Sequence, residues 1–271
     1  MIQTLSILHA GALRMPIAEC AKLLKETHPD WEIRLESFGS RACARQIREG
    51  KVVDILALAD PMLFDELLVP EYVDKYYIFA NDQIVLAYNE FSKGSAEITP
   101  DNWYDILLEE GITFGRSNHN LDPCGYRTNE KQQLAEKHYG QEGLFGRLDR
   151  KCTGEFIYPK SYDMASEVLV GKLDYAFSYL CVANQFGLPY LKLPERINLS
   201  NPSHAKHYQQ ASVSLQGKNS GEMVCVTGAP IEFAIAIPKN ADNPEVADTF
   251  LDLILGKKGR QLMEDCGLVP Y

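Results

Sequence analysis

Short apolar runs alternate with helix-forming segments at the beginning of the chain. Pro16 suits a first helical turn, and His28-Pro29 ends the helix that it starts. Val53–Ala59 is a nearly continuous apolar run, which is typical of a strand buried on both faces of a parallel sheet. This β-α-β-α-β order predicts an α/β fold. The expected strands are Leu5–Leu8, Glu32–Ser37 and Val53–Ala59, and the expected helices are Pro16–Thr27 and Arg41–Glu49.

The same alternation starts again further along the chain, which favours two α/β lobes over one large sheet. We expect a crossing near Asn81–Asn89 and a return near Pro189–Leu199. Lobe I would then comprise residues 1–81 and 190–271, with the C-terminal helices packed on it, and lobe II residues 82–189. The expected strands are Tyr77–Ala80, Ile84–Tyr88, Ile112–Gly115, Tyr175–Tyr179 and Ile231–Ile237, and the expected helices are Asn102–Leu108, Pro123–His138, Ser161–Val170 and most of Ala247–Cys266.

The composition is that of an ordinary folded protein, and it narrows the classes of partner. Of the 271 residues, 45% are hydrophobic and 24% are charged, so wholesale disorder is excluded. The net charge of −10 opposes non-specific attraction to DNA or anionic lipid, and we expect no nucleic-acid partner. The seven cysteines are an odd number without a CxxC pair, which argues against a disulfide framework and a zinc cluster. We therefore expect no cofactor, no protein-bound metal and mostly buried, reduced thiols.

The start of the chain leaves the location open. No apolar run approaches the ~20 residues that a membrane helix needs. Met1–Ser6 is too short and uncharged for an export signal. Either the protein stays inside the cell, or a signal that preceded this segment has been removed.

Four loops place a small or turn-forming residue directly before a helix. Helix N-termini carry unpaired N–H groups and about half a positive charge, so they bind anions readily. Two such loops from each lobe, facing across a cleft, would surround a small anion with donors. The alternative is that Ser40, Asp122 and Ser161 are only N-caps of their helices. The loops are His9–Ala12, Phe38–Ser40, Asp122–Gly125 and Lys160–Asp163.

A series of short motifs runs through nearly the whole chain. They are His9-Ala10-Gly11-x-Leu13-x-x-Pro16, Asp60, Ile84–Tyr88, Asn102–Tyr104, Asp122-Pro123-Cys124-Gly125-Tyr126-Arg127, Leu173–Phe177, Leu193-Pro194-Glu195-x-Ile197-Asn198-Leu199 and Ile237–Ala241. Together these motifs resemble the archaeal-type tungstate/molybdate-binding proteins of ABC importers. The resemblance implies a two-lobe periplasmic-binding-protein fold (type II) with the ligand cleft between the lobes. It also implies an extracytoplasmic location, an ABC permease as partner and a monomeric state.

The resemblance also implies a set of ligand-binding positions. Asp122 matches a carboxylate that approaches the metal centre of the bound oxyanion in the family. Gly11, Arg14, Gly39 and Arg41 are possible additions to the set. The positions carried over are Ala12, Ser40, Leu58, Asp122, Cys124, Ser161 and Tyr179.

The sequence departs from the family pattern at three of these positions. Ala12 and Leu58 stand where the family usually has serines, so only their backbone N–H groups would donate there. Ser161 stands where the family has a second metal-contacting glutamate. Neutral donors around a four-coordinate tetrahedral oxyanion therefore fit better than six-coordinate binding, with Asp122 capping its own helix. Tungstate or molybdate is the expected ligand, and sulfate or another dianion gains weight.

Two further features each have a functional and a structural interpretation. Arg14 and Arg41 would neutralise ligand charge, or else they are solvated surface residues. His119 and Cys124 lie close to Asp122 in sequence, and a helix start favours the thiolate form of a cysteine. The alternative function is therefore an enzyme on the same two-lobe fold, acting on a small anionic substrate through these three residues. No spacing fixes the base, however, and backbone donation explains Cys124 equally well.

Overall fold

The computed structural model describes residues 3–219 and 221–271 and divides the chain into two compact units. Unit 1 comprises the chain up to Asn81 together with Glu232–Tyr271, and unit 2 comprises Asp82–Ile231. The chain thus crosses into unit 2 once and returns once.

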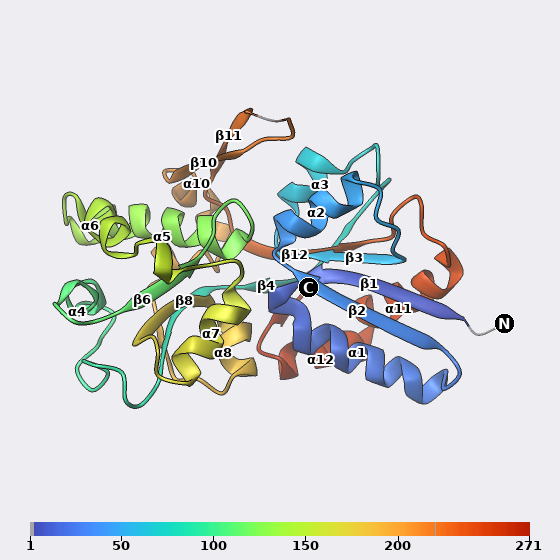
Figure 1. Cartoon of the computed structure of the whole chain (residues 1–271), viewed down its shortest axis with the longest axis horizontal. Coiled ribbons are helices and arrows are strands. Elements are labelled where there is room, and N and C mark those ends of the chain that lie inside the picture. The colour runs from blue at the N-terminus through green and yellow to red at the C-terminus, as the bar shows by residue number, and fades with distance from the viewer. Residues whose placement is uncertain (1–2, 220) are drawn as a thin grey trace. The chain divides into compact units, whose positions relative to one another are not determined.

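Unit 1 is a mixed sheet with helices on both faces (Figure 1). The strand order is β13-β4-β12-β3-β1-β2, in which β1 is parallel to β2 and β3, while β12 is antiparallel to β3. The expectation of a wholly parallel neighbourhood for β3 is therefore wrong, because the returning chain enters the sheet beside it. The strands are β1 Thr4–Ala10, β2 Glu32–Phe38, β3 Ile55–Leu58, β4 Tyr77–Asp82, β12 Ile231–Ala236 and β13 Val269–Pro270.

Two groups of helices cover the sheet of unit 1. Helices α1, α11 and α12 contact one another, and α2 contacts α3 on the other side (Figure 1). The C-terminal stretch expected to be largely helical is two helices, because Gly256 adopts an extended conformation between them. The helices are α1 Arg14–Thr27, α2 Ser40–Arg48, α3 Met62–Leu67, α11 Pro244–Leu255 and α12 Lys257–Asp265.

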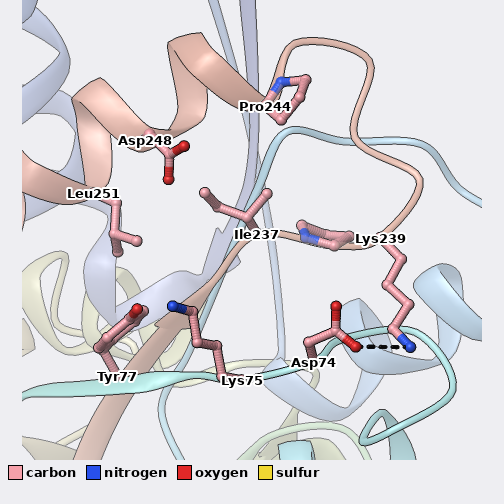
Figure 2. A pocket seen from close by; sticks show the side chains of 9 residues that line it. Asp74, Lys75, Tyr77, Ile237, Lys239, Pro244, Asp248 and Leu251 are labelled. Carbon is pink, nitrogen blue, oxygen red and sulfur yellow. Dashed lines mark ion pairs between the residues drawn. The ribbon is translucent and has the colours of Figure 1, made fainter.

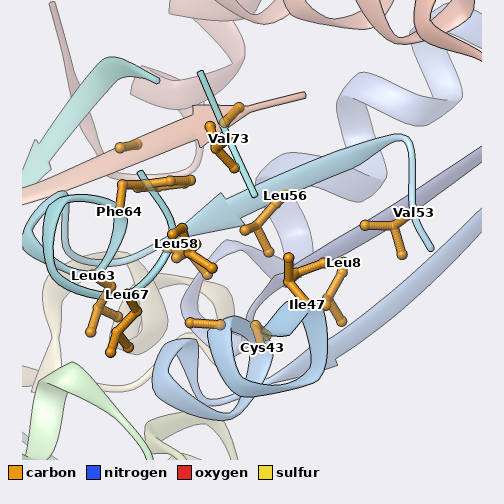
Figure 3. Close-up of a cluster of buried hydrophobic side chains, with 14 residues drawn as sticks. Leu8, Cys43, Ile47, Val53, Leu56, Leu58, Leu63, Phe64, Leu67 and Val73 are labelled. Carbon is orange, nitrogen blue, oxygen red and sulfur yellow. The ribbon is translucent and has the colours of Figure 1, made fainter. Parts of the chain in front are cut away.

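The core under α2 and α3 follows from the alternation along the strands. Successive strand side chains point to opposite faces, so Leu8, Leu56 and Leu58 reach the same core (Figure 3). Helix α2 contributes Ile47 and α3 contributes Phe64, each at most 1% exposed. Burying such side chains contributes ~1.5–3 kcal/mol each, so this core holds the loops at the strand ends in place.

Unit 2 has a second sheet with the order β7-β6-β8-β5-β9 (Figure 1). Strand β6 is parallel to β7 and β8, and β5 is antiparallel to β8 and β9. Helix α5 contacts β5, β6 and β8, and α7 contacts β5, β6, β7 and β8. The strands are β5 Ile84–Tyr88, β6 Phe114–Ser117, β7 Ile157–Tyr158, β8 Tyr175–Tyr179 and β9 Tyr190–Lys192, and the helices are α4 Trp103–Leu108, α5 Pro123–Tyr139, α6 Leu144–Lys151, α7 Ser161–Leu169, α8 Leu180–Gln185, α9 Glu195–Asn198 and α10 Ala205–Tyr208.

The return to unit 1 lies between Ile231 and Glu232, and the expected boundary at residue 190 is wrong. Strand β9 pairs with β5, so the segment that resembled a linker completes the second sheet. The antiparallel hairpin of β10 (Ser212–Gln216) and β11 (Met223–Thr227) then packs on α5. Gln133 on α5 holds it through hydrogen bonds to the backbone of Ser212.

Candidate functional site

The loops expected to bind an anion follow strand ends in both units. In unit 1, the hydroxyl of Ser40 accepts a hydrogen bond from the N–H of Ala59 at 2.9 Å. Ser40 is fully buried and is the first residue of α2, and Gly39 is the N-cap. The interpretation of Ser40 as an N-cap is therefore wrong. Its oxygen ties the start of α2 to the end of β3, and its hydrogen is available for donation.

The other neutral positions of unit 1 are backbone positions. Gly11 and Ala12 lie in a short 3₁₀ helix directly after β1 and are buried. The side chain of Leu58 belongs to the hydrophobic core, so it contributes no polar group. These residues agree with the expectation that any donation here comes from backbone N–H groups.

The two arginines of unit 1 differ sharply in burial. Arg14 is exposed, as the surface interpretation expects, whereas Arg41 is only 1% exposed and the surface interpretation is wrong for it. Burial raises the pKa of Glu66, and the positive charge of Arg41 opposes that shift. Arg41 therefore places a buried positive charge directly after Ser40 in the chain.

In unit 2, the carboxylate of Asp122 joins the beginnings of two helices. Its Oδ1 accepts from the N–H of Cys124 at 3.2 Å, so Asp122 is the N-cap of α5, as expected. Its Oδ2 accepts from the N–H of Ser161, the first residue of α7, at 2.7 Å. Burial raises the pKa of Asp122 to about 6, and these hydrogen bonds limit the rise. The Cys124 N–H, expected to hold the ligand, is thus engaged by Asp122 in this structure.

The first turn of α5 lies directly against the end of β6 because residue 125 has no side chain. A Cβ atom on Gly125 would lie 2.3 Å from the carbonyl oxygen of Ser117 and 2.7 Å from the N of His119. Two backbone N–H groups, those of Leu121 and Asp122, donate to the carbonyl of Asn118 and tighten the connecting turn. Close backbone packing therefore explains why the Asp122–Arg127 motif has a glycine at residue 125.

Buried hydroxyls surround the Asp122 carboxylate. Ser161 is not an N-cap, since Lys160 holds that position and no side-chain cap is formed. The Oγ atoms of Ser117 and Ser161 are buried and have no partner at good hydrogen-bond geometry among the described residues. Both hydroxyls nevertheless lie near enough to Asp122 to favour its charged form. Tyr179, the last residue of β8, is also fully buried, and burial raises the pKa of its phenol well above the ordinary value.

The thiol of Cys124 is not arranged as a nucleophile. It is fully buried, and its Sγ–H contacts the carbonyl oxygen of Phe177 at 3.6 Å. Burial, followed by the charge of Asp122, raises the thiol pKa well above its ordinary value, so the expected thiolate-favouring position is wrong. The Nδ1 atom of His119 lies 3.4 Å from Nη1 of Arg116.

Two buried residues of unit 2 were missed by the sequence analysis. Ser117 closes a strand one turn before the Asp122 loop, a position that the strand-then-loop pattern could have marked. Asp82, at the crossing into unit 2, accepts from the N–H groups of Gln83 at 2.7 Å and Cys181 at 3.2 Å. Burial raises the pKa of Asp82 to about 7, and it holds the start of α8 directly after Tyr179. No sequence motif points to the contact between Asp82 and Cys181, because these residues lie far apart in the chain.

A cavity of about 330 Å³ also opens in unit 1, between β4, the end of β12 and α11 (Figure 2). It contains none of the predicted binding residues. Its charged groups compensate one another: Lys239 pairs with Asp74 at 2.8 Å, and Lys75 lies over the ring of Tyr77 at 5.3 Å near Asp248. The cavity therefore offers no excess of positive charge to an anion.

Among residues 3–219 and 221–271, no group of three or more His, Cys, Asp or Glu side chains is arranged to hold a metal ion. Within those ranges, no helix has both the length and the apolar character to cross a bilayer.

Two α/β units joined by two crossings are the architecture of periplasmic binding proteins. The periplasmic molybdate-binding protein of Azotobacter vinelandii shares this fold, with a TM-score of 0.71 at 14% identity over 98% of each chain. Residues 5–269 match the family described as bacterial extracellular solute-binding proteins, and the chain belongs to that family.

Sequence relatives cover almost the whole chain. An uncharacterized solute-binding protein of Petrotoga mobilis is 38% identical over 262 residues, which are 96% of this chain and 82% of that protein. The molybdate/tungstate-binding protein WtpA of Pyrococcus abyssi is 35% identical over 289 aligned positions, covering 96% of this chain and 83% of that protein. The resemblance noted from the motifs is confirmed.

Proposed function

We propose that this solute-binding protein captures a tetrahedral oxyanion dianion, molybdate or tungstate first and sulfate second, and delivers it to an ABC permease outside the cytoplasm. The family and the WtpA relative support this class of ligand. The residues that we assign to ligand binding are Ser40 in unit 1 and Ser161 and Tyr179 in unit 2.

The observation that carries the proposal is the donor chemistry around Asp122. A buried hydroxyl without a partner costs about 1–3 kcal/mol, so such groups need a reason. Ser161 has a hydroxyl of this kind at a position that the family resemblance assigns to ligand binding. An oxyanion accepts hydrogen bonds through all its oxygens, and it would satisfy that hydroxyl.

The charge distribution explains why four-coordinate binding is proposed. Both oxygens of Asp122 accept backbone hydrogen bonds, so the carboxylate is turned toward its own helices. Ser161 supplies no second carboxylate. Arg41 of unit 1 is buried, and its positive charge would offset the charge of a dianion.

Thermal melts with and without anions test the proposal. The purified protein is heated alone and with molybdate, tungstate, sulfate, phosphate or chloride at equal ionic strength. A ligand at a hundredfold excess over its Kd stabilises the fold by about 2.7 kcal/mol, so at least one dianion should raise the Tm by several degrees. If no oxyanion shifts the Tm beyond the chloride control, the proposed function is wrong.

A further inference from the structure

Ser117 presents an unexplained polar group at the edge of the unit 2 half-site. Its side chain is fully buried, and its Oγ has no partner at good hydrogen-bond geometry among the described residues. The backbone around it is fixed, because β6 pairs with β7 at Ser117–Tyr158 and Gly125 lies against its carbonyl. The backbone therefore fixes the position of the Ser117 hydroxyl.

The surroundings of Ser117 place it beside the predicted ligand position. Its hydroxyl is close enough to Asp122 and to the Cys124 thiol to lower the pKa of both groups. Asp122 in turn holds the N–H of Ser161, whose hydroxyl is also buried without a partner. Two buried hydroxyls, neither with a partner at good hydrogen-bond geometry among the described residues, thus flank one carboxylate at the starts of α5 and α7.

We propose that Ser117 binds the oxyanion directly, as a second hydroxyl donor beside Ser161. The inference rests on the proposed function of this half-site. An acceptor placed next to Asp122 would satisfy both hydroxyls at once. Hydroxyl donors suit a fully deprotonated dianion here, since they add no charge beside the buried carboxylate and donate to ligand oxygens, which carry no hydrogen of their own.

Removing the Ser117 hydroxyl should separate binding from stability. In Ser117→Ala, the affinity for molybdate or tungstate should fall roughly ten- to a hundredfold, the effect of one lost hydrogen bond to a charged ligand. The Tm without anion should stay the same or rise, because a buried unsatisfied group is removed. Ser117→Cys keeps the shape with a weaker donor, and its affinity should lie between those of the two other proteins.

Thr128 offers a matched control in the same unit. It is also fully buried, but its hydroxyl donates to the carbonyl of Cys124 at 2.7 Å. Thr128→Val should therefore lower the Tm and leave anion affinity within about twofold, the reverse of Ser117→Ala.

The measurements are calorimetric titrations with sodium molybdate and sodium tungstate and melts without anion, on all four proteins. If the wild-type protein binds and Ser117→Ala binds within twofold, the inference is wrong. It is also wrong if Ser117→Ala lowers the Tm while affinity is unchanged, since the hydroxyl would then serve Asp122 alone. If the wild-type protein binds neither anion, it is the proposed function that fails.

Discussion

The buried polar groups of the two units differ in their hydrogen-bond partners and in the sign of the buried charge beside them. In unit 1, the Ser40 hydroxyl accepts from Ala59, and the next residue carries a buried positive charge. In unit 2, the buried hydroxyls of Ser117 and Ser161 have no partner at good hydrogen-bond geometry among the described residues, and the buried charge nearby is the carboxylate of Asp122. The Ser40 hydroxyl of unit 1 thus has a partner in its own unit, whereas the Ser117 and Ser161 hydroxyls of unit 2 lie near the Asp122 carboxylate and would gain a well-placed acceptor from a ligand. The contrast teaches that stability and binding should respond differently to mutation in the two units.

The largest effect is expected from Asp122→Ala. The substitution leaves the N–H groups of Cys124 and Ser161 without an acceptor at the starts of two helices. The free energy of unfolding should fall by about 2–4 kcal/mol, measured by urea denaturation at pH 7. Asp122→Asn is the intermediate variant: its amide oxygen still accepts from one helix N–H while its NH2 faces the other, so it should lose less stability than Asp122→Ala and keep most of the anion affinity. Loss of tungstate binding in a folded Asp122→Asn protein would make Asp122 a direct ligand and contradict the four-coordinate arrangement.

A change of pH should act on unit 2 next most strongly. Burial raises the pKa of Asp122 to about 6 and that of Asp82 to about 7, so the folded state holds these protons more tightly than the unfolded chain. Their contribution to stability is full below about pH 4 and is lost as the pH rises through 6 and 7, at about 1.4 kcal/mol per pKa unit. Urea denaturation from pH 5 to 8 should show this decline, and Asp82→Asn should flatten it. An unchanged slope in that variant would contradict the assignment.

Ser40 and Ser161 test the contrast between the units directly. Ser40→Ala removes the acceptor of the buried Ala59 N–H, and unfolding free energy should fall by about 1–2 kcal/mol. Ser161→Ala removes a hydroxyl without a partner, so its stability should be unchanged or slightly higher. Both should weaken molybdate binding in calorimetric titrations. Equal losses of stability in the two variants would remove the distinction drawn between the units.

The buried charge of unit 1 should contribute to affinity. Arg41→Gln should weaken binding of the dianion roughly tenfold, about 1.4 kcal/mol, because a desolvated positive charge is lost near the ligand. Arg14→Gln, at an exposed position, should change the affinity little. Titrations of both variants with tungstate decide the matter, and an equal loss in each would contradict a special role for Arg41.

The smallest effect is expected at Cys124. Its thiol is buried with a raised pKa, so Cys124→Ala should leave anion affinity within about twofold. In the folded wild-type protein, a thiol reagent should react rapidly with the exposed Cys225 and slowly with Cys124. Peptide mapping after brief labelling identifies the modified cysteine. Rapid modification of Cys124 would reopen the enzymatic alternative.

Local sequence signals predicted most of the strands and helices. Tyr175–Tyr179 is a strand with the expected bounds, because a short apolar run before a helix has few other solutions. The pattern missed β9, since three residues in a Pro- and Leu-containing stretch gain strand structure only by pairing with β5. The unit boundary near residue 190 was misplaced for the same reason: pairing between distant segments decides it.

For the candidate site too, local features were predictable from the sequence and long-range contacts were not. Asp122 before Pro123 is a strong local cap signal, and the cap is present. Ser40 and Ser161 carry the same type of signal, yet they lie one residue inside their helices. The contacts of Ser40 with Ala59 and of Asp122 with Ser161 join distant segments, and a single sequence does not encode them in any local pattern.

A calorimetric titration of the wild-type protein with tungstate, and then with molybdate, tests the central claim most directly. We expect one saturable site per chain for at least one of these anions. We also expect that sulfate competes for that site, because four-coordinate binding by neutral donors accepts any tetrahedral dianion of fitting size. A folded protein that gives no saturable heat with tungstate, molybdate or sulfate would contradict the account.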